Sequence, residues 1–290
     1  MDGDAPVRRP ADPPARFARM TDANDTPRLG GMALANGLLV HGPTHWAAAV
    51  RNGDGEIIVA SGPKPRFARG VLARVPVVRG ALRMAESVAV VPVARAKTPG
   101  ARLAMENARV VAAVAGSAMI ASIVRRSSRS ALLQESVGAV AGLLPAVATL
   151  RGSSAAATWH AVEHKSIAAY EAGGPSEVVR AAAHPKEHMR CGTNLVLPLM
   201  IFNVVVNTAI RRMAPRPTTA VRMAGSMLSV GAAVELFAFA HRRPDHPVSR
   251  AVHRVGHTIQ ARFATREPGP GEMVVGRAAM DEILRVEGVT

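Results

Sequence analysis

The sequence predicts a mainly α-helical, polytopic membrane protein with about four helical spans and a small β-hairpin element near the N-terminus. Four long apolar segments follow one another after Arg109. Hydrophobic residues make up 48% of the 290 residues, but aromatic residues only 3%. A soluble core of this size usually contains more Phe, Tyr and Trp, so the composition favours a membrane protein. Two apolar runs around the turn sequence RNGDGE indicate the β element.

The first 100 residues are predicted to hold a tail, a β element and an amphipathic helix. Residues 1–29 contain acidic residues, Pro and Arg but no apolar core, which predicts a disordered tail and not a secretory signal. Residues 30–100 begin with a β element over about 31–62, because Asn-Gly and Asp-Gly are strong hairpin signals. The rest of this region has apolar residues at helical spacing, with Arg on the other face. Such a helix suits either a membrane surface or packing on a soluble core.

Residues 101–290 are predicted to form a helical membrane domain. The uncharged runs at 110–124 and 136–150 are only about fifteen residues long, which makes them marginal spans or a re-entrant hairpin. The runs at 191–210 and 223–240 are stronger candidates, rich in small residues that let helices approach in lipid. Buried helices of a soluble bundle are the alternative.

An even number of spans would place both termini on one side of the cell (inner or plasma) membrane. The Arg-rich terminal regions are then expected in the cytoplasm, together with the loop of residues 151–190. Glu235, inside the last apolar run, is either functional or paired with a nearby Arg. The formal charge of +15 comes from Arg spread along the whole chain, without interleaved aromatic residues. This pattern favours a lipid bilayer as partner and no nucleic acid.

The loop of residues 151–190 contains the sequence TWHAVEHKSIAAYE, in which helical spacing points four polar residues to roughly one side. They are His160, Glu163, His164 and Glu171. Two His four residues apart can share one divalent ion, most suitably Zn²⁺, while a neighbouring Glu takes a proton from water. The order His-x-x-Glu-His is the reverse of the zincin motif and occurs in inverzincins. Glu171 is a further candidate ligand, or a solvated residue at the helix end.

A second polar segment, HPKEHMRCGTN at 184–194, precedes the third apolar run. It offers His188 and Cys191 as further metal ligands, and a thiolate ligand favours Zn²⁺ over Mg²⁺. Arg190 and Lys165 are candidates for steadying negative charge during a reaction. The alternative interpretation has Cys191 buried at a helix start, with the His residues solvated.

Four stretches resemble the bacterial YqhQ-like family of uncharacterised membrane proteins, which are described as metal-dependent enzymes. They are GGMALANGLLVHGPTHWAAAVR, HAVEHKSIAAYE, HMRCGTN and TREP, and the resemblance runs from about Gly30 to the C-terminus. Asn36 and His41 depart from the family pattern, which has an acidic residue and an Arg there. The resemblance implies functional roles for residues in two blocks, namely His160, Glu163, His164, Lys165 and Glu171, and His188, Arg190, Cys191, Gly192 and Thr193.

These observations favour a metal-dependent integral membrane enzyme that is hydrolase-like, with Glu163 as general base and an unidentified substrate. A non-catalytic membrane scaffold or partner-binding protein with a structural His/Glu/Cys cluster is the second hypothesis. An ion transporter that uses Glu235 is a third.

Overall fold

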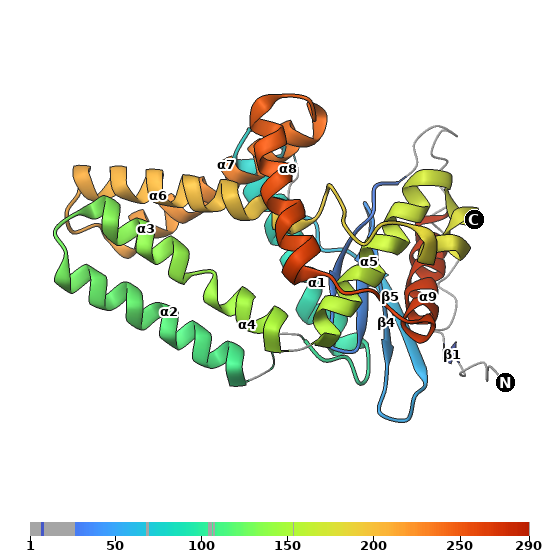
Figure 1. Ribbon diagram of the computed structural model, residues 1–290. Helices are drawn as coiled ribbons and strands as arrows, with labels where there is room; N and C mark the ends of the chain where they lie inside the picture. Colours follow the sequence, from blue (N-terminus) through green and yellow to red (C-terminus); the bar gives the residue numbers. More distant parts are fainter. Residues whose placement is uncertain are drawn as a thin grey trace.

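The chain folds into a head and an elongated arm (Figure 1). The structure, a computed structural model, describes residues 7–8, 27–67, 70–103, 106, 108–152 and 154–289. Most of the predicted tail at 1–29 therefore lies outside the described residues.

The strands are β1 (Val7–Arg8), β2 (Gly30–Ala33), β3 (Gly37–His41), β4 (His45–Arg51) and β5 (Ile57–Pro63). The helices and helical turns are η1 (Gly70–Ala73), α1 (Val78–Lys97), α2 (Ala108–Ser127), α3 (Ala131–Ala141), α4 (Leu144–Gly152), α5 (Ser154–Gly173), η2 (Pro175–Ala183), η3 (Gly192–Leu195), α6 (Val196–Met213), α7 (Thr219–Arg242), α8 (Pro247–Ile259), η4 (Gln260–Ala264) and α9 (Pro270–Glu287).

The head is built on a sheet of strand order β1-β5-β4-β3-β2. Strands β2 to β5 pair antiparallel, and β1 adds to β5 in parallel. In the β4–β5 turn, Asn52 Oδ1 accepts hydrogen bonds from the backbone N–H of Asp54 and Glu56, at 3.0 and 2.9 Å. Gly55 there has φ of 85°, a conformation that favours glycine. The predicted hairpin is confirmed, and it is part of a larger antiparallel sheet.

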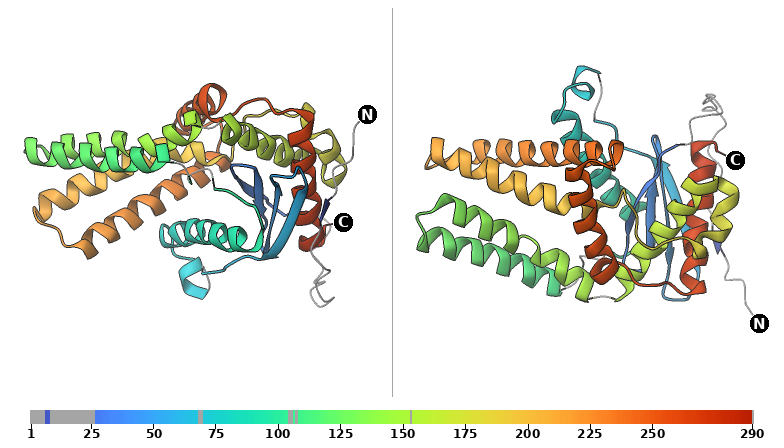
Figure 2. Two further views of the ribbon diagram at one scale, coloured as in Figure 1. Left: turned by 90° about the horizontal axis from the view of Figure 1, so that it is seen from below. Right: turned by 45° about the horizontal axis from the view of Figure 1, so that its top comes forward.

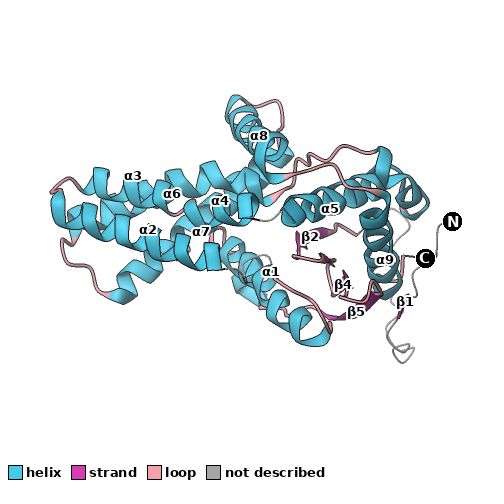
Figure 3. Cartoon of the chain, turned by 60° about the horizontal axis from the view of Figure 1, so that its bottom comes forward, coloured by secondary structure: helices cyan, strands magenta, loops and turns pink. Residues whose placement is uncertain are grey.

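Both faces of the sheet are buried, each under different helices (Figure 3). Ala47 and Ala49 of β4 join one apolar cluster with α5 and α9. Trp46 and Ala48 alternate to the other face, where they join a cluster with α1. The head is therefore a three-layer unit, and α5, which carries the predicted metal motif, lies in one outer layer against the sheet.

Helix α1 packs on other parts of the protein at both of its ends, which agrees with the packing role that the sequence left open. Its second half packs on the sheet through Val90 and Ala94. Its first turns pack on α7, where a Cβ added at Gly80 would lie 3.1 Å from the carbonyl oxygen of Gly231. Arg79 forms a two-pronged ion pair with Glu235, with Nε–Oε1 and Nη2–Oε2 distances of 2.8 and 2.7 Å. Of the two alternatives for Glu235, the structure therefore shows the pairing with a nearby Arg.

The arm consists of helices that are long and apolar enough to cross a membrane. In the described part of the chain, four candidate spans satisfy length and composition, at Ala108–Ser127, Ala131–Thr149, Gly192–Met213 and Thr219–Arg242. The two segments that looked marginal extend as helices past their flanking charges, since α2 alone has 20 residues, about 30 Å. The second span is interrupted at Gly142, between α3 and α4. In each of the four spans, 28% or less of the residues are buried inside the protein, as expected for helices in lipid.

The arm is made of two helical hairpins that meet along α3 and α6 (Figure 2). The turns between α2 and α3 and between α6 and α7 lie at the far tip, whereas β1 and α9 lie at the head (Figure 1). Near the tip, Arg211 joins the hairpins by an ion pair to Glu135 at 2.5 Å and a hydrogen bond to Gln134 at 2.6 Å. Helix α8 crosses the base of the arm at a steep angle, between arm and head (Figures 1 and 2).

Asn36 and His41, two polar residues of the N-terminal block, have structural roles in the head. The Asn36 side chain donates to the carbonyl of Arg51 at 2.7 Å and accepts from the backbone N–H of Arg102 at 3.0 Å. His41 contacts Lys64, with Nδ1 and Nζ 3.1 Å apart. Burial, with the nearby charge of Lys64, lowers the pKa of His41 to about 4.

The lowered pKa of His41 predicts acid sensitivity of the head. The folded state holds this imidazole neutral, so its contribution is fully present above pH 6.5 and is lost as the pH falls towards 4, by at most about 3 kcal/mol. Thermal unfolding in detergent should therefore show the stability difference between wild type and His41→Gln shrinking over this pH range. Parallel curves for the two proteins would contradict the prediction.

Candidate metal centre

Helix α5 is held in place by close packing against α9 and by the segment that follows η4. A Cβ added at Gly276 of α9 would lie 2.5 Å from Val162 Cγ1 and 2.9 Å from Ser166 Oγ, so glycine lets the two helices approach. The backbone N–H of Arg266, in the TREP block, donates to the carbonyl of Ala157 at 3.0 Å. With Val162 and Ser166 facing α9, the helical period turns His160 and His164 towards η4 and the 184–194 segment.

Three of the predicted ligands converge. His160 Nε2 lies 3.2 Å from Cys191 Sγ, and the rings of His160 and His164 have centroids 4.3 Å apart. One ligand atom from each of His160, His164 and Cys191 lies within 4.8 Å of the other two. We call this group the His/His/Cys cluster. It is mostly buried, with His164 only 1% and Cys191 8% exposed.

Backbone carbonyls fix both imidazoles of the His/His/Cys cluster. His160 Nδ1 contacts the carbonyl oxygen of Ala264 at 2.9 Å, and His164 Nδ1 that of Lys186 at 2.6 Å. A carbonyl only accepts, so each Nδ1 carries the proton and each Nε2 keeps a lone pair. His164 Nε2 is buried and has no hydrogen-bond partner among the described residues. This pattern is typical of metal-binding histidines, whose second nitrogen donates to a fixed acceptor.

The loop that carries Cys191 is held by η4, a π-helical turn. The side chain of Gln260 accepts from the backbone N–H of His188 at 2.7 Å and donates to Thr193 Oγ1 at 2.9 Å. The same turn supplies the carbonyl of Ala264 that binds His160. Sequence reasoning missed this turn, because neither the Gln nor a backbone carbonyl has a recognisable pattern. π-helical turns are rare and are frequently found at functional sites.

Glu163 is buried beside the His/His/Cys cluster and under strand β2. It is 7% exposed, and a Cβ at Gly31 would lie 2.6 Å from its Cγ and 2.8 Å from its Oε1. Glycine at this position therefore makes room for the carboxyl group, a role that no local sequence pattern indicates. Burial raises the pKa of Glu163 to about 6, against an opposing effect of His160. The group is mostly ionised at pH 7 and close to its own titration, as a general base requires.

Burial keeps the His164 imidazole and the Cys191 thiol uncharged. Burial lowers the pKa of His164 to about 2, so the imidazole has a free lone pair over the whole physiological range. Burial, together with the nearby Glu163 carboxylate, raises the pKa of the Cys191 thiol to about 11. A protonated thiol is a poor nucleophile, which disfavours cysteine-based catalysis. A bound cation would deprotonate a coordinating thiol.

Two other predicted ligands, His188 and Glu171, contact each other next to the cluster. His188 Nε2 lies 3.0 Å from Glu171 Oε2, and Arg190 forms an ion pair with the same carboxylate. The rings of His164 and His188 have centroids 5.7 Å apart. The structure therefore places Glu171, His188 and Arg190 in a second group beside the His/His/Cys cluster, and not among its converging ligand atoms.

Lys165 contacts backbone carbonyls and a carboxylate outside the His/His/Cys cluster. Its Nζ donates to the carbonyls of Ala182 and His184, at 3.0 and 2.8 Å. It also forms an ion pair of 2.7 Å with Glu267 of the TREP block. His184, in turn, lies 3.3 Å from Glu177. In this arrangement Lys165 anchors η2 and the chain after η4 to helix α5.

The fold and site together define a class of protein: a head with a buried His/His/Cys cluster, joined to four candidate membrane spans. The chain belongs to a family described as protein of unknown function DUF1385, whose model matches residues 140–286, about half of the chain. That match includes α5, the Cys191 loop, the third and fourth candidate spans, and α9. No curated protein and no solved structure matches the chain.

Proposed function

We propose that the protein is a metal-dependent membrane hydrolase in which His160, His164 and Cys191 hold Zn²⁺. The observation that carries this proposal is the convergence of three ligand atoms within 4.8 Å. The histidine His164 also has a buried Nε2 that finds no hydrogen-bond partner among the described residues. Two imidazoles and a thiolate suit Zn²⁺ better than Mg²⁺ or Ca²⁺. Three protein ligands are typical of catalytic zinc sites, whereas structural sites have four.

Zn²⁺ in such a site supplies Lewis acidity and makes a water molecule more acidic. Glu163 is proposed to accept a proton from water, a role supported by the burial of its carboxyl group beside the cluster and its pKa of about 6. Arg190 directly precedes the ligand Cys191 and pairs with Glu171 next to the His/His/Cys cluster, whereas Lys165 is bound to backbone carbonyls of η2. We therefore propose that Arg190, and not Lys165, stabilises negative charge. His188 and Glu171 are proposed to orient Arg190 and not to bind the metal.

A structural metal site is the second candidate function. Cys191 lies directly before the third candidate span, whereas His160 and His164 belong to the head. An ion bound by all three would tie the head to the arm, as a scaffold or partner-binding protein would need. In this case Glu163 would have no catalytic part.

The Glu163→Gln variant separates the two functions. We expect it to retain Zn²⁺, measured by mass spectrometry of the purified protein in detergent, because Glu163 is not among the converging ligands. Hydrolysis of a panel of chromogenic phosphate and carboxylate esters should fall by about 10²–10⁴-fold, the usual contribution of a general base. The matched control is Glu187→Gln, a carboxylate that pairs with Lys186 outside the cluster. Wild-type protein that holds Zn²⁺ and hydrolyses none of the panel would favour the structural site.

We also propose that the chain is a YqhQ-like protein of the bacterial cell membrane, with its head in the cytoplasm. The described residues contain four candidate spans, and β1 and α9, which flank these spans in the sequence, both lie on the side of the head (Figure 1). A single cysteine without a disulfide is compatible with a reducing compartment.

A further inference from the structure

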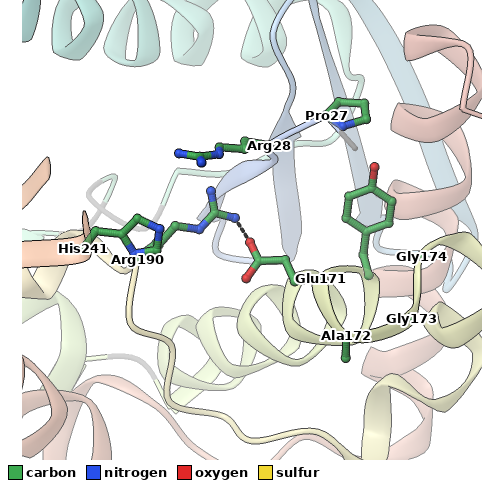
Figure 4. A pocket seen from close by; sticks show the side chains of 9 residues that line it. Pro27, Arg28, Glu171, Ala172, Gly173, Gly174, Arg190 and His241 are labelled. Carbon is green, nitrogen blue, oxygen red and sulfur yellow. Dashed lines mark ion pairs between the residues drawn. The ribbon is translucent and has the colours of Figure 1, made fainter. Parts of the chain in front are cut away.

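A pocket opens where the head meets the arm, next to the ion pair between Glu171 and Arg190 (Figure 4). Its volume is about 290 Å³. The head contributes Arg28, Glu171 and Arg190, and the end of α7 contributes His241. Arg28, Arg190 and His241 lie together on one side of the pocket (Figure 4). Glu171 lines the pocket and also contacts His188, whose ring neighbours that of His164. The pocket is therefore separated from the His/His/Cys cluster by little more than one side chain.

The pocket carries an excess of positive charge. The carboxylate of Glu171 is already engaged by Arg190 and His188. Arg28 has no ion-pair partner in the part of the chain that the structure describes, and its guanidinium lies beside that of Arg190 (Figure 4). Arg28 and Arg190 are two neighbouring guanidinium groups, but only Arg190 is paired with the Glu171 carboxylate, which leaves a site for one further anion. In addition, His241 Nδ1 is buried and finds no hydrogen-bond partner among the described residues.

The position of the pocket indicates where its ligand comes from. His241 is the penultimate residue of the candidate span Thr219–Arg242, so the pocket lies at the depth where this span would leave the apolar part of a bilayer. Helix α8 begins a few residues later and crosses the base of the arm, as a helix in the plane of a membrane surface would (Figure 2). The headgroups of phospholipids occupy this depth, and their phosphates match the fork geometry of Arg.

We propose that this pocket binds the phosphate headgroup of an anionic membrane lipid and thereby presents a phosphate-bearing lipid to the neighbouring metal centre. The proposal rests on the proposed function for the reaction, but binding itself does not require it. Arg28 would contact the phosphate from the head, while His241 would donate or accept a hydrogen bond from the end of the span. Arg190 would remain paired with Glu171 and share the anion.

Lipid binding to the full-length protein tests this proposal. Wild-type protein in nanodiscs of phosphatidylcholine is titrated with phosphatidic acid, in zinc-loaded and in metal-stripped form. We expect phosphatidic acid to bind at least about 10-fold more tightly than phosphatidylcholine, and Arg28→Gln to remove that preference. Arg28→Lys should retain part of it. The matched control is Arg254→Gln, an exposed Arg of α8 outside the pocket, which should keep the preference.

Two results would overturn the proposal. One is an unchanged lipid preference in Arg28→Gln, which would mean that general surface charge attracts the lipid. The other is glycerol phosphate binding as tightly as phosphatidic acid, which would make a soluble phosphate ester the ligand. The stripped sample separates this proposal from the hydrolase: lipid selectivity in a protein that never holds Zn²⁺ would leave the pocket intact and remove only the reaction.

Discussion

Cys191→Ser protein is expected to bind Zn²⁺ at least about 100-fold more weakly than wild type. Removing a group that only hydrogen-bonds to a metal ligand already costs about 10–100-fold in metal affinity, and Cys191 is itself a proposed ligand. The sulfur lies 3.2 Å from His160 Nε2, and a serine hydroxyl would be a much weaker ligand at neutral pH. Competition with a chromogenic chelator measures the affinity. His164→Ala should have a similar effect, because it removes the buried nitrogen that has no other partner among the described residues.

The matched control for these variants is His184→Ala, which changes a histidine of the same segment that faces Glu177 and not the cluster. It should leave Zn²⁺ affinity unchanged. If Cys191→Ser bound Zn²⁺ as tightly as wild type while His164→Ala did not, Cys191 would be a buried residue at a helix start. The metal site would then have to recruit His188, by releasing it from Glu171.

Gly276→Val should lower the free energy of unfolding by about 3 kcal/mol, at the upper end of the range for overpacked cores. The added side chain would meet Val162 Cγ1 at 2.5 Å and Ser166 Oγ at 2.9 Å, and Val162 is completely buried and stiff. Thermal unfolding in detergent should show a midpoint roughly 5–10 °C lower. Because α5 carries both histidines of the cluster, Zn²⁺ affinity should fall as well.

The control for Gly276→Val is Gly116→Val, in α2 of the arm, where an added Cβ would meet nothing within 4 Å. Its midpoint should change little. Equal losses from both variants would mean that removing glycine from a helix, and not the contact between α5 and α9, determines the effect.

Much of the fold was predictable because its signals are local. The apolar runs, the RNGDGE turn and the amphipathic pattern of α1 each depend on neighbouring residues. The lengths of the first two arm helices were underestimated, because the apolar runs end at Arg and Glu although the helices continue past these charged residues. The second strand pair and the packing of α1 between sheet and α7 depend on contacts far apart in the chain, which no local pattern encodes.

The candidate site was predictable as a set of residues but not as an arrangement. Helical spacing brought His160 and His164 together correctly, and the convergence of Cys191 with them in the structure agrees with the predicted two-part site. Residue spacing could not show that Glu171 and His188 would contact each other. It also could not show that Lys165 would donate to the carbonyls at the end of η2. The supporting carbonyls of Lys186 and Ala264 have no side-chain signature at all.

The π-helical turn η4 makes the geometry of the site depend on the number of residues in this turn. A π-helical turn contains one residue more than the α-helical path it replaces, and here that path runs from α8 into the TREP block. Deleting a single residue within Gln260–Ala264 would let α8 continue as a regular helix. The side chain of Gln260 and the carbonyl of Ala264 would then rotate out of register with each other, and Cys191 and His160 would lose their supports together. Substitutions in this turn change one contact at a time, whereas an insertion or deletion would change the spacing of both halves of the site.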